Sequence, residues 1–261
     1  MAKKQKDKKQ IVRSNLFLDM LKRIYLGGIF EECVLNIKKG KGEVTAVDIT
    51  NSMIVISKKR IMPKNIINEF GLGNLELLIK FLSSIEDNKM QFQTTENSLI
   101  LMRPDGKRKL NYLLTQTELI ATRFQEEDDE EAPYKKISKM MKHRIDITNS
   151  FAKDFLVYIG LLKTKEIMLE YDGHENVLFT CGSSEDHQFE LQLESKVEDG
   201  DTKGFTIKLN GEHLSKILSA INFDEEQLPV LSFAKNKPIM IEEGGTAWVL
   251  VPIIGIEEEI E

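Results

Sequence analysis

Four short segments of the chain place apolar residues at helical spacing. In the first of them, Phe17, Met20, Leu21 and Ile24 form one stripe, and Asp19 falls outside it. The later stripes are Leu78, Phe81, Leu82 and Ile85, then Phe151, Phe155, Ile159 and Leu162 within Ser150–Lys163, and the apolar positions of Glu212–Ile221. We therefore predict four short amphipathic helices, two in each half of the chain.

Short apolar or alternating segments separate these helices and predict β-strands. In the first half they are Val34–Lys38, Glu43–Val47, Met53–Lys58, Ile66–Phe70 and a hairpin-rich stretch, Lys89–Thr115. In the second half they are Glu166–Tyr171, Val177–Cys181, His187–Leu193 and Phe205–Leu209, followed by further hairpins. Strands joined by short turns pair antiparallel, so the expected fold class is α+β, with the helices confined to one face of each sheet.

The second half of the chain repeats the first. The matched positions are Asn74 with Asn210, Glu76 with Glu212, Leu78 with Leu214, Lys80 with Lys216, Leu82 with Leu218, Ser83 with Ser219 and Ile85 with Ile221. A hairpin follows each copy, with its turn at Asp105-Gly106 in the first and at Gly244-Gly245 in the second. A duplication of this length predicts two similar domains, each with two short helices packed on antiparallel sheets.

We expect four regions along the chain. Residues 1–12 are interpreted as a disordered basic arm, because they are rich in lysine and hold little that can pack. Residues 13–121 form the first domain, and residues 143–261 form the second, which ends in an acidic tail. Residues 122–142 are interpreted as an acidic linker between the domains, since like charges repel and no apolar period is present there.

Charge is distributed unevenly along the sequence. The 261 residues carry a formal net charge of -6, which argues against a protein that coats nucleic acid nonspecifically. Two acidic runs, Glu126–Glu131 and Glu257–Glu259, hold nine of the negative charges, and removing nine from -6 leaves +3. The folded body can therefore offer a positive surface despite the acidic total.

The sequence lacks membrane and secretory signals. No apolar run approaches the roughly 20 residues of a membrane span, and the basic N-terminus lacks the apolar stretch of a secretory signal. Cys33 and Cys181 each lie in an expected strand, and two thiols make no disulfide framework. We expect an intracellular protein with no membrane partner.

The sequence also lacks a pattern of catalytic or metal-binding residues. His143, His174, His187 and His213 are scattered and do not have the spacing of metal ligands. Neither a G-x-x-x-x-G-K-[ST] phosphate loop nor a G-x-S-x-G nucleophile motif occurs, and Gly71-Leu-Gly73 is interpreted as a turn. The expectation is a protein without catalytic activity, metal site or cofactor.

Five segments, taken in order, match motifs of a known family. They are Ala46–Asn51, Leu78–Leu82, Leu214–Leu218, Lys237–Glu242 and Val249–Ile253, which precedes the acidic tail. With their duplication, over roughly residues 14–259, the chain resembles the DNA polymerase sliding-clamp family, both its proliferating-cell nuclear antigen branch and its bacteriophage branch. The resemblance implies a homotrimeric ring of six similar domains that encircles duplex DNA without sequence preference. It also implies that the ring tethers DNA polymerase, is opened by a clamp-loader ATPase and has no catalytic activity.

The resemblance and the helical pattern together predict a DNA-facing surface. Each expected helix carries at least one base outside its apolar stripe. These bases are Lys22, Arg23, Lys80, Lys153, Lys163 and Lys216. If the helices line a hole, the bases face phosphates spaced at about one charge per 1.7 Å of duplex. A solvated helix face is the alternative for each lysine alone, whereas the recurrence of Lys80 as Lys216 favours the DNA role.

The resemblance further implies two protein-binding surfaces. A partner groove between the domains would involve Val47, Tyr134, Pro238, Val249, Val251 and Pro252. Val249 and Val251 would equally suit the core of almost any fold. Subunit contacts would join the edge strands Lys109–Leu114 and Gln188–Leu193 of neighbouring copies, through Lys109, Leu110, Tyr112, Phe189 and Leu191.

The leading interpretation is a homotrimeric sliding clamp that serves as a polymerase processivity factor in DNA replication. Two alternatives stay open: a subunit of a heteromeric repair or checkpoint clamp, and a monomeric α+β module that binds peptides without DNA. The phage-like features favour a viral protein. A viral or bacterial protein of this kind would act in the cytoplasm of a prokaryotic cell. A eukaryotic one would act in the nucleus.

Overall fold

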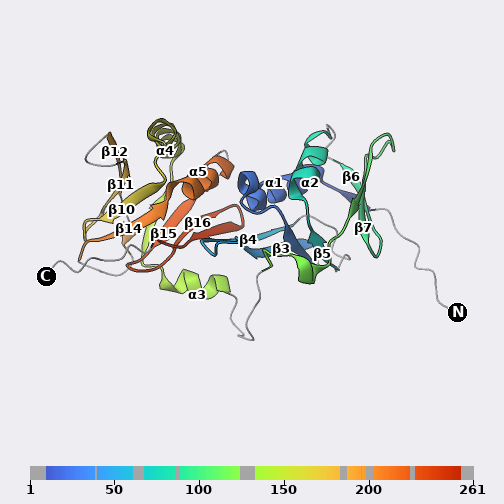
Figure 1. Ribbon diagram of the computed structural model, residues 1–261, viewed down its shortest axis with the longest axis horizontal. Coiled ribbons are helices and arrows are strands. Elements are labelled where there is room, and N and C mark those ends of the chain that lie inside the picture. The colour runs from blue at the N-terminus through green and yellow to red at the C-terminus, as the bar shows by residue number, and fades with distance from the viewer. Residues whose placement is uncertain are drawn as a thin grey trace. The chain divides into compact units, whose positions relative to one another are not determined.

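The computed structural model divides the chain into two compact units (Figure 1). It describes residues 10–38, 40–60, 68–85, 89–123, 133–182, 187–194, 196–197, 203–223 and 227–253. Unit 1 comprises residues 1–49 and 55–124, and unit 2 comprises residues 50–54 and 125–261. Each unit combines short helices with antiparallel sheets, so the α+β fold class is confirmed.

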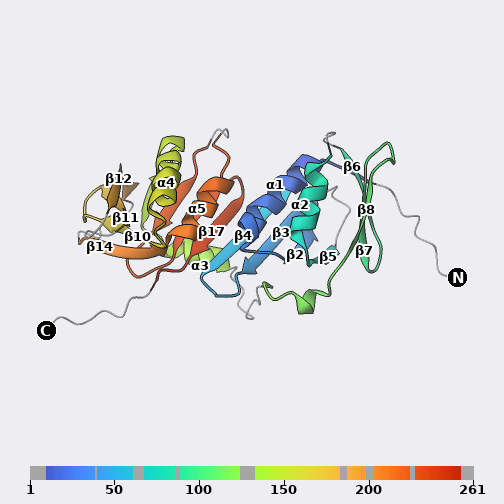
Figure 2. The same ribbon diagram turned by 45° about the horizontal axis from the view of Figure 1, so that its top comes forward.

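Unit 1 contains two helices that pack against each other (Figure 2). They are α1 (Ser14–Tyr25) and α2 (Leu75–Ser83), and the single-turn 3-10 helices are η1 (Leu26–Gly28) and η2 (Thr117–Leu119). One sheet has the order β1-β6-β7-β8, formed by Gln10–Val12, Met90–Thr94, Ser98–Met102 and Lys109–Leu113. The other has the order β4-β3-β2-β5, formed by Met53–Arg60, Lys41–Val47, Cys33–Lys38 and Asn68–Leu72, and the start of β4 belongs to unit 2.

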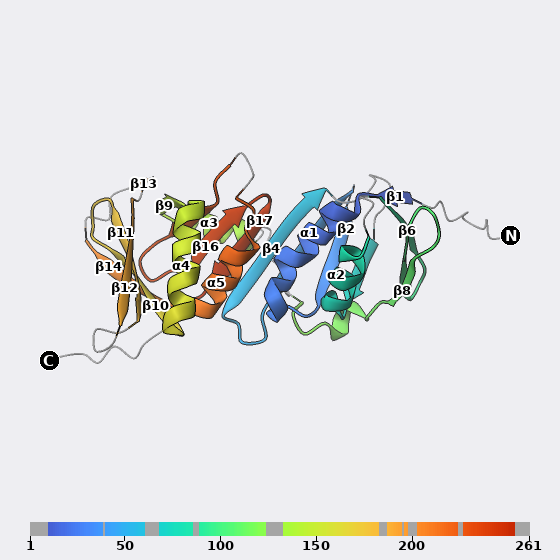
Figure 3. The ribbon, with the colours of Figure 1, turned by 90° about the horizontal axis from the view of Figure 1, so that it is seen from above.

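The apolar stripe of the first predicted helix forms the centre of unit 1. Phe17, Met20, Leu21 and Ile24 are fully buried, as their 3.6-residue spacing predicts. Figure 3 shows α1 and α2 over the same face of the sheet that contains β2, β3 and β4. Burial alternates along β2, where Cys33 and every second residue point inward, so one face of this sheet packs under the helices.

Unit 2 repeats this plan. Its helices are α3 (Pro133–Met140), α4 (Asn149–Leu162) and α5 (Gly211–Ala220), of which α4 and α5 pack against each other. One sheet has the order β12-β11-β10-β14, formed by Gln188–Glu194, Asn176–Gly182, Glu166–Tyr171 and Phe205–Asn210. The other contains β13-β9-β15-β16-β17, formed by Lys196–Val197, His143–Asp146, Val230–Phe233, Ile239–Glu243 and Thr246–Leu250.

An aromatic cluster lies in the core of unit 2. The ring of His143 stacks on Phe233 with centroids 5.0 Å apart and lies 4.3 Å from Tyr171, and Phe205 borders all three. Because the His143 side chain is fully buried among these rings, it acts as a core residue.

Two predicted boundaries change in the structure. Residues 10–12, assigned to the arm, form β1 and pair with β6. Thr122, assigned to the linker, is buried in unit 1, where its carbonyl accepts the N–H of Val47 at 3.1 Å. The linker range also contains helix α3, whose first residue is Pro133; proline is favoured there because it has no N–H to leave unbonded.

Gly71 and Gly73 mark a close approach of two backbones rather than the predicted turn. Gly71 lies in β5 and forms a bridge with Thr115, whose N–H donates to the Gly71 carbonyl at 2.9 Å. A Cβ at position 71 would collide with the Thr115 carbonyl, and one at position 73 would collide with the Thr115 hydroxyl. Only glycine fits at this packing distance.

Candidate functional site

The duplicated segment forms equivalent helix starts in the two units. Asn74 precedes α2, and its side-chain oxygen accepts the N–H of Leu77 at 2.9 Å. Asn210 precedes α5 and accepts the N–H of His213 at 3.1 Å. Each asparagine therefore satisfies one of the backbone N–H groups that a helix start leaves unbonded. The repeat seen in the sequence is thus a repeat of helix-capping geometry.

The same helices carry equivalent ion pairs on their outer sides. Glu76 Oε1 lies 2.6 Å from Lys80 Nζ on α2, and Glu212 Oε1 lies 3.1 Å from Lys216 Nζ on α5. Each glutamate lies in the first turn, where the helix dipole favours negative charge. The hydrogen bond from Lys216 lowers the pKa of Glu212, and that with Glu76 raises the pKa of Lys80. Lys80 is therefore charged at neutral pH and lies on an exposed surface, whereas the side chain of Lys216 is half-buried.

Three further predicted bases lie on helix surfaces. Lys22 on α1 and Lys153 on α4 are exposed. Lys163 ends α4 in a left-handed conformation, with its N–H donating to the Ile159 carbonyl at 2.9 Å, and its side chain is exposed. These positions leave all three ammonium groups accessible to a polyanion.

Arg23 does not belong to this surface, and its assignment as DNA-facing is corrected. Its side chain is only 1% exposed, and its Nε donates to Asp19 Oδ1 at 3.0 Å. Lys59 on β4 reaches the other oxygen of the same carboxylate at 2.5 Å. Arg23 thus pairs with a carboxylate of its own helix, as a buried guanidinium requires, and the contact of Lys59 with that carboxylate joins α1 to β4.

Asp19 should make unit 1 sensitive to acid. Burial raises the pKa of this carboxyl, but hydrogen bonds from Lys59 and Arg23 outweigh burial and hold it below its ordinary value of 3.8. A lowered folded-state pKa adds stability above the unfolded pKa, and that stability is lost as pH falls through the folded pKa. Because the Asp19 side chain is 41% exposed and solvent screens its ion pairs, we expect Asp19→Asn to destabilise unit 1 by only about 1 kcal/mol at pH 7.

Hydrogen–deuterium exchange localises this effect. In Asp19→Asn, peptides from α1 should exchange faster at pH 7, whereas those from α4 should be unchanged. The difference between variant and parent should shrink below pH 4, since the parent then loses the same charge. A variant as protected as the parent at pH 7 would show that this ion-pair network has no stabilising role.

The predicted partner residues divide between the units. Val47 is half-buried in unit 1, whereas Pro238, Val251 and Pro252 are half-buried in unit 2. Val249 is 0% exposed within β17, so its assignment to a partner surface is wrong; it is a core residue. Tyr134 belongs to helix α3, and its side chain lies outside the described residues.

The end of the described chain is held by backbone hydrogen bonds in unit 2. The N–H of Val251 donates to the Ser52 carbonyl at 2.9 Å, and that of Ile253 donates to the Lys208 carbonyl at 2.8 Å. These bonds fix Pro252 between them. The half-buried face of this segment therefore has a defined conformation, as a binding surface for a short peptide requires.

Both predicted interface strands lie at sheet edges. β8 ends the order of its sheet in unit 1, and β12 ends the order of its sheet in unit 2. Lys109 on β8 is exposed, and Leu110 on the same strand is half-buried. Phe189 and Leu191 on β12 are half-buried, and the Phe189 ring stacks on Tyr158 of α4 with centroids 3.9 Å apart. Edge strands offer backbone groups to which another strand can pair.

Tyr112 is corrected from an interface residue to a core residue. Its side chain is 3% exposed, and its hydroxyl oxygen accepts the N–H of Asn74 at 2.7 Å. Burial raises the pKa of this phenol to about 12, so it stays neutral at physiological pH. Tyr112 therefore joins β8 to the start of α2, inside unit 1.

Removing the Tyr112 hydroxyl should leave a buried N–H without its partner. We expect Tyr112→Phe to lower the free energy of unfolding by about 1–2 kcal/mol in urea titrations followed by circular dichroism. Tyr158→Phe is the matched control, because the ring of Tyr158 keeps its stacking contact with Phe189. Equal stabilities of the two variants would contradict the role assigned to the hydroxyl.

The structure adds exposed apolar residues that the sequence prediction omitted. Leu113 on β8 is 73% exposed, and Leu161 on α4 is 68% exposed. Val157, one helical turn before Leu161, is also exposed, and α4 contacts the edge strand β12. Leu161 and Val157 fall outside the predicted apolar stripe of their helix, which is the signal that could have identified them. Exposed apolar residues beside sheet edges are typical of protein interfaces.

Metal ligands are not grouped in the described part of the chain, and its two thiols are not activated. Within it, no three His, Cys, Asp or Glu side chains gather closely enough to hold a metal ion. Burial raises the pKa of Cys33 to about 12 and that of Cys181 to about 11, so both thiols are protonated and unreactive. No helix among the same residues is long and apolar enough to cross a membrane.

The architecture is that of known PCNA and β-clamp structures. Proliferating cellular nuclear antigen from Entamoeba histolytica matches with a TM-score of 0.71 and 13% identity, over 94% of this chain and 98% of that one. PCNA from A. fulgidus, bound to the C-terminal region of FEN-1, matches with a TM-score of 0.69 and 15% identity over 95% and 99%. The Helicobacter pylori β clamp, bound to a DNA ligase peptide, matches with a TM-score of 0.66 and 16% identity, over 97% of this chain and 68% of that one.

These likenesses define the class of fold. The chain has the sliding-clamp fold shared by PCNA and β-clamp structures, as the sequence resemblance predicted. No protein-family model and no curated protein sequence matches the chain. The fold is therefore clear at identities of 13–16%, and the biological role has to be argued from the surfaces described above.

Proposed function

We propose that this chain is a DNA sliding clamp, a polymerase processivity factor that closes into a homotrimeric ring around duplex DNA. The observation that carries the proposal is the equivalence of α2 and α5. The clamp fold presents the same capped helix twice, with Lys80 and Lys216 at the same position of each copy. Accessible bases also lie on the helices that pack against α2 and α5: Lys22 on α1, Lys153 on α4 and Lys163 at the end of α4.

Weak phosphate contacts are sufficient for such a clamp. Nonspecific binding through lysines has dissociation constants of about 10⁻⁴–10⁻⁶ M at physiological salt, and screening makes each contact brief. A closed ring stays on DNA because of its topology, so brief contacts permit sliding without release. The ion pairs with Glu76 and Glu212 orient the lysines and moderate the positive charge at the same time.

Ring closure requires head-to-tail contacts between copies. Edge strand β8 in unit 1 and edge strand β12 in unit 2 are different surfaces, so pairing one with the other is heterologous and closes when the rotation allows. The exposed Leu113 on β8 and Leu161 beside β12 supply apolar contacts for this junction. A clamp-loader ATPase would open one such junction to admit DNA.

Partner proteins would bind at the clamp groove implied by the resemblance. Val47, Tyr134, Pro238, Val251 and Pro252 are its proposed residues. Peptide-bound PCNA and β clamp are among the matched structures, which supports a peptide-binding role for the same fold here. DNA polymerase is the proposed principal partner, and the chain itself performs no chemistry.

Molecular mass in solution separates this proposal from its alternatives. Multi-angle light scattering should give three times 29.9 kDa for a homotrimer. A mass of 29.9 kDa at micromolar concentration would favour a monomeric peptide-binding module. Copurification with related chains from the native source would favour a heteromeric repair or checkpoint clamp. Either result would contradict the proposed homotrimer.

A further inference from the structure

The cap of α5 contains the only Asn-Gly pair in the sequence, Asn210-Gly211. Asparagine followed by glycine is chemically labile, because glycine has no Cβ to hinder attack by its own nitrogen on the preceding side chain. The equivalent cap of α2 reads Asn74-Leu75, where the leucine side chain hinders that attack. The two copies of the repeat therefore differ in reactivity at the same structural position.

Close packing explains why a glycine follows the cap in unit 2. Gly211 is buried, and a Cβ on it would lie 2.6 Å from Ile159 Cδ1 of α4 and 3.2 Å from Ile167 Cγ2 of β10. Such short contacts would push these side chains aside, so glycine lets α5 start close to α4 and β10. Since Asn210 is the residue that caps α5, the fold itself brings the labile pair together.

The folded geometry keeps the reacting groups apart. Deamidation begins when the Gly211 nitrogen attacks Cγ of Asn210. Asn210 has a ψ of 111°, which places its Cβ and the Gly211 nitrogen on opposite sides of the Cα–C bond, whereas ring closure needs them on the same side. The Gly211 N–H also donates to the Lys165 carbonyl at 2.8 Å, and Asn210 Oδ1 accepts the N–H of His213 at 3.1 Å. These hydrogen bonds have to break before the attack.

We propose that Asn210 is a latent deamidation site, which is protected while α5 is folded and reacts when α5 opens. The Gly211 nitrogen forms a bond to Cγ of Asn210, and the side-chain nitrogen leaves as ammonia with the proton that the Gly211 nitrogen loses. Water then opens the resulting succinimide at either carbonyl, which gives aspartate or isoaspartate. The site belongs to unit 2 alone, so the proposal does not depend on ring formation.

The two products affect α5 differently. Aspartate caps a helix start about as well as asparagine, and its negative charge is favoured there by the helix dipole. In isoaspartate the main chain runs through the former side chain, so the oxygen that accepts the N–H of His213 becomes part of the backbone. Neither product returns to asparagine. A copy in which α5 has once opened and reacted is therefore marked for as long as it exists.

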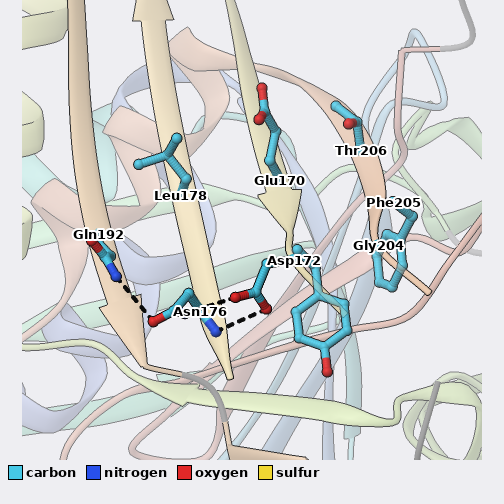
Figure 4. A pocket seen from close by; sticks show the side chains of 9 residues that line it. Glu170, Asp172, Asn176, Leu178, Gln192, Gly204, Phe205 and Thr206 are labelled. Atoms are coloured by element: carbon cyan, nitrogen blue, oxygen red, sulfur yellow. Dashed lines mark hydrogen bonds between the residues drawn. The ribbon is translucent and has the colours of Figure 1, made fainter. Parts of the chain in front are cut away.

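Asn176 supplies a control within the same unit. It lies at the end of a cavity of about 510 Å³ that residues of the four strands β10, β11, β12 and β14 line (Figure 4). Dashed lines in Figure 4 mark the bonds from Asn176 Nδ2 to Asp172 Oδ2, at 2.7 Å, and from Gln192 Nε2 to Asn176 Oδ1, at 2.9 Å. The β-branched Val177 follows it, and this side chain hinders attack even in the unfolded chain.

Peptide mass spectrometry of the full-length chain tests the proposal. The chain is incubated in mildly alkaline buffer, either folded or unfolded in urea. The peptide that contains Asn210 gains the mass difference between an amide and an acid, and chromatography separates aspartate from isoaspartate. Peptides that contain Asn74 and Asn176 are measured in the same samples as internal controls.

In urea, we expect Asn210 to deamidate at least about tenfold faster than Asn74 or Asn176. In the folded chain, Asn210 should react at least about a hundredfold more slowly than in urea, because only the open fraction reacts. Equal rates in the folded and unfolded chains would overturn the protection by α5. A rate in urea no higher than that of Asn74 would overturn the lability of the site.

Two substitutions that loosen α5 test the gating. Leu214 and Ile217 are buried residues of this helix. In native buffer, Leu214→Ala should speed the deamidation of Asn210 at least about tenfold, and the milder Ile217→Val about threefold. Leu78→Ala, the matched change in α2, should leave the rate unchanged. If hydrogen exchange shows a loosened α5 and the rate still equals that of the parent, the proposal is wrong.

Discussion

Reversing the charge of Lys80 and Lys216 is expected to shorten the products of processive DNA synthesis by about tenfold. In the proposed homotrimer the Lys80→Glu/Lys216→Glu variant replaces six ammonium groups with six carboxylates, at positions that the proposal places opposite phosphates. A plot of the logarithm of the DNA-binding constant against the logarithm of the salt concentration should become shallower. Its slope should change by about 0.9 for each phosphate that the variant no longer neutralises. Primer extension on a long template, with the cognate polymerase and loader, measures the product length.

Two controls separate this effect from unfolding and from net charge. The lysines lie at the helix surface in pairs with glutamate, so the variant should keep the thermal unfolding midpoint of the parent within a few degrees. Lys107→Glu/Lys235→Glu reverses two exposed lysines outside the helices and should leave product length unchanged. If Lys80→Glu/Lys216→Glu gives products as long as those of the parent, α2 and α5 do not face DNA.

Placing a carboxylate at Leu113 is expected to dissociate the assembly into monomers. Leu113 is exposed on the edge strand β8, so Leu113→Asp should not disturb the core of unit 1. In the proposed junction the aspartate would be buried against apolar groups without a partner, which raises the dissociation constant by roughly a hundredfold. Light scattering at about 1 µM, below the weakened dissociation constant, should then give 29.9 kDa instead of three times that value.

Leu119→Asp is the matched control for this variant. Leu119 is 69% exposed in the single-turn helix η2, outside the proposed junction, and receives the same chemical change. This variant should keep the mass of the parent, and both should keep the parent's circular dichroism spectrum. A full-size assembly in Leu113→Asp would exclude β8 from the subunit contact.

The apolar stripes of the sequence predicted the helix positions well, because burial imposes a strict period. Phe17, Met20, Leu21 and Ile24 are all buried as their spacing requires. The duplicated Asn, Glu and Lys positions also predicted two equivalent helices, and the structure explains the repeat through capping and ion pairing. Local patterns are reliable where one physical cause, such as burial or capping, dominates the choice of residue.

The misassigned residues are those whose burial depends on contacts distant in sequence. Arg23 lies at the margin of an apolar stripe, and its carboxylate partner Asp19 is itself held by Lys59 on β4, 40 residues further along the chain. In β8 both Tyr112 and Leu113 are apolar enough for the core, so alternation alone does not say which one points inward. Because the Tyr112 hydroxyl accepts the N–H of Asn74, Tyr112 is the one of the two that points inward.

Surface roles were predictable only in part. Lys22, Lys80, Lys153, Lys163 and Lys216 have accessible or half-buried side chains, and their contact with DNA stays a prediction. Helix α3 was missed because the acidic run before it dominates the composition of the segment, although Pro133 offered a helix-start signal. The cavity on the outward sheet face depends on four adjacent strands, so no local pattern reveals it.

The most direct test of the central claim is retention on DNA of different topology. The chain is loaded, with ATP and the clamp-loader ATPase of its own source, onto nicked circular plasmid, and free protein is removed by gel filtration in high salt, which screens simple phosphate contacts. We predict that protein stays with the circle and is lost within minutes when a single restriction cut makes the plasmid linear. Equal loss from circular and linear DNA, or equal retention on both, would contradict encirclement.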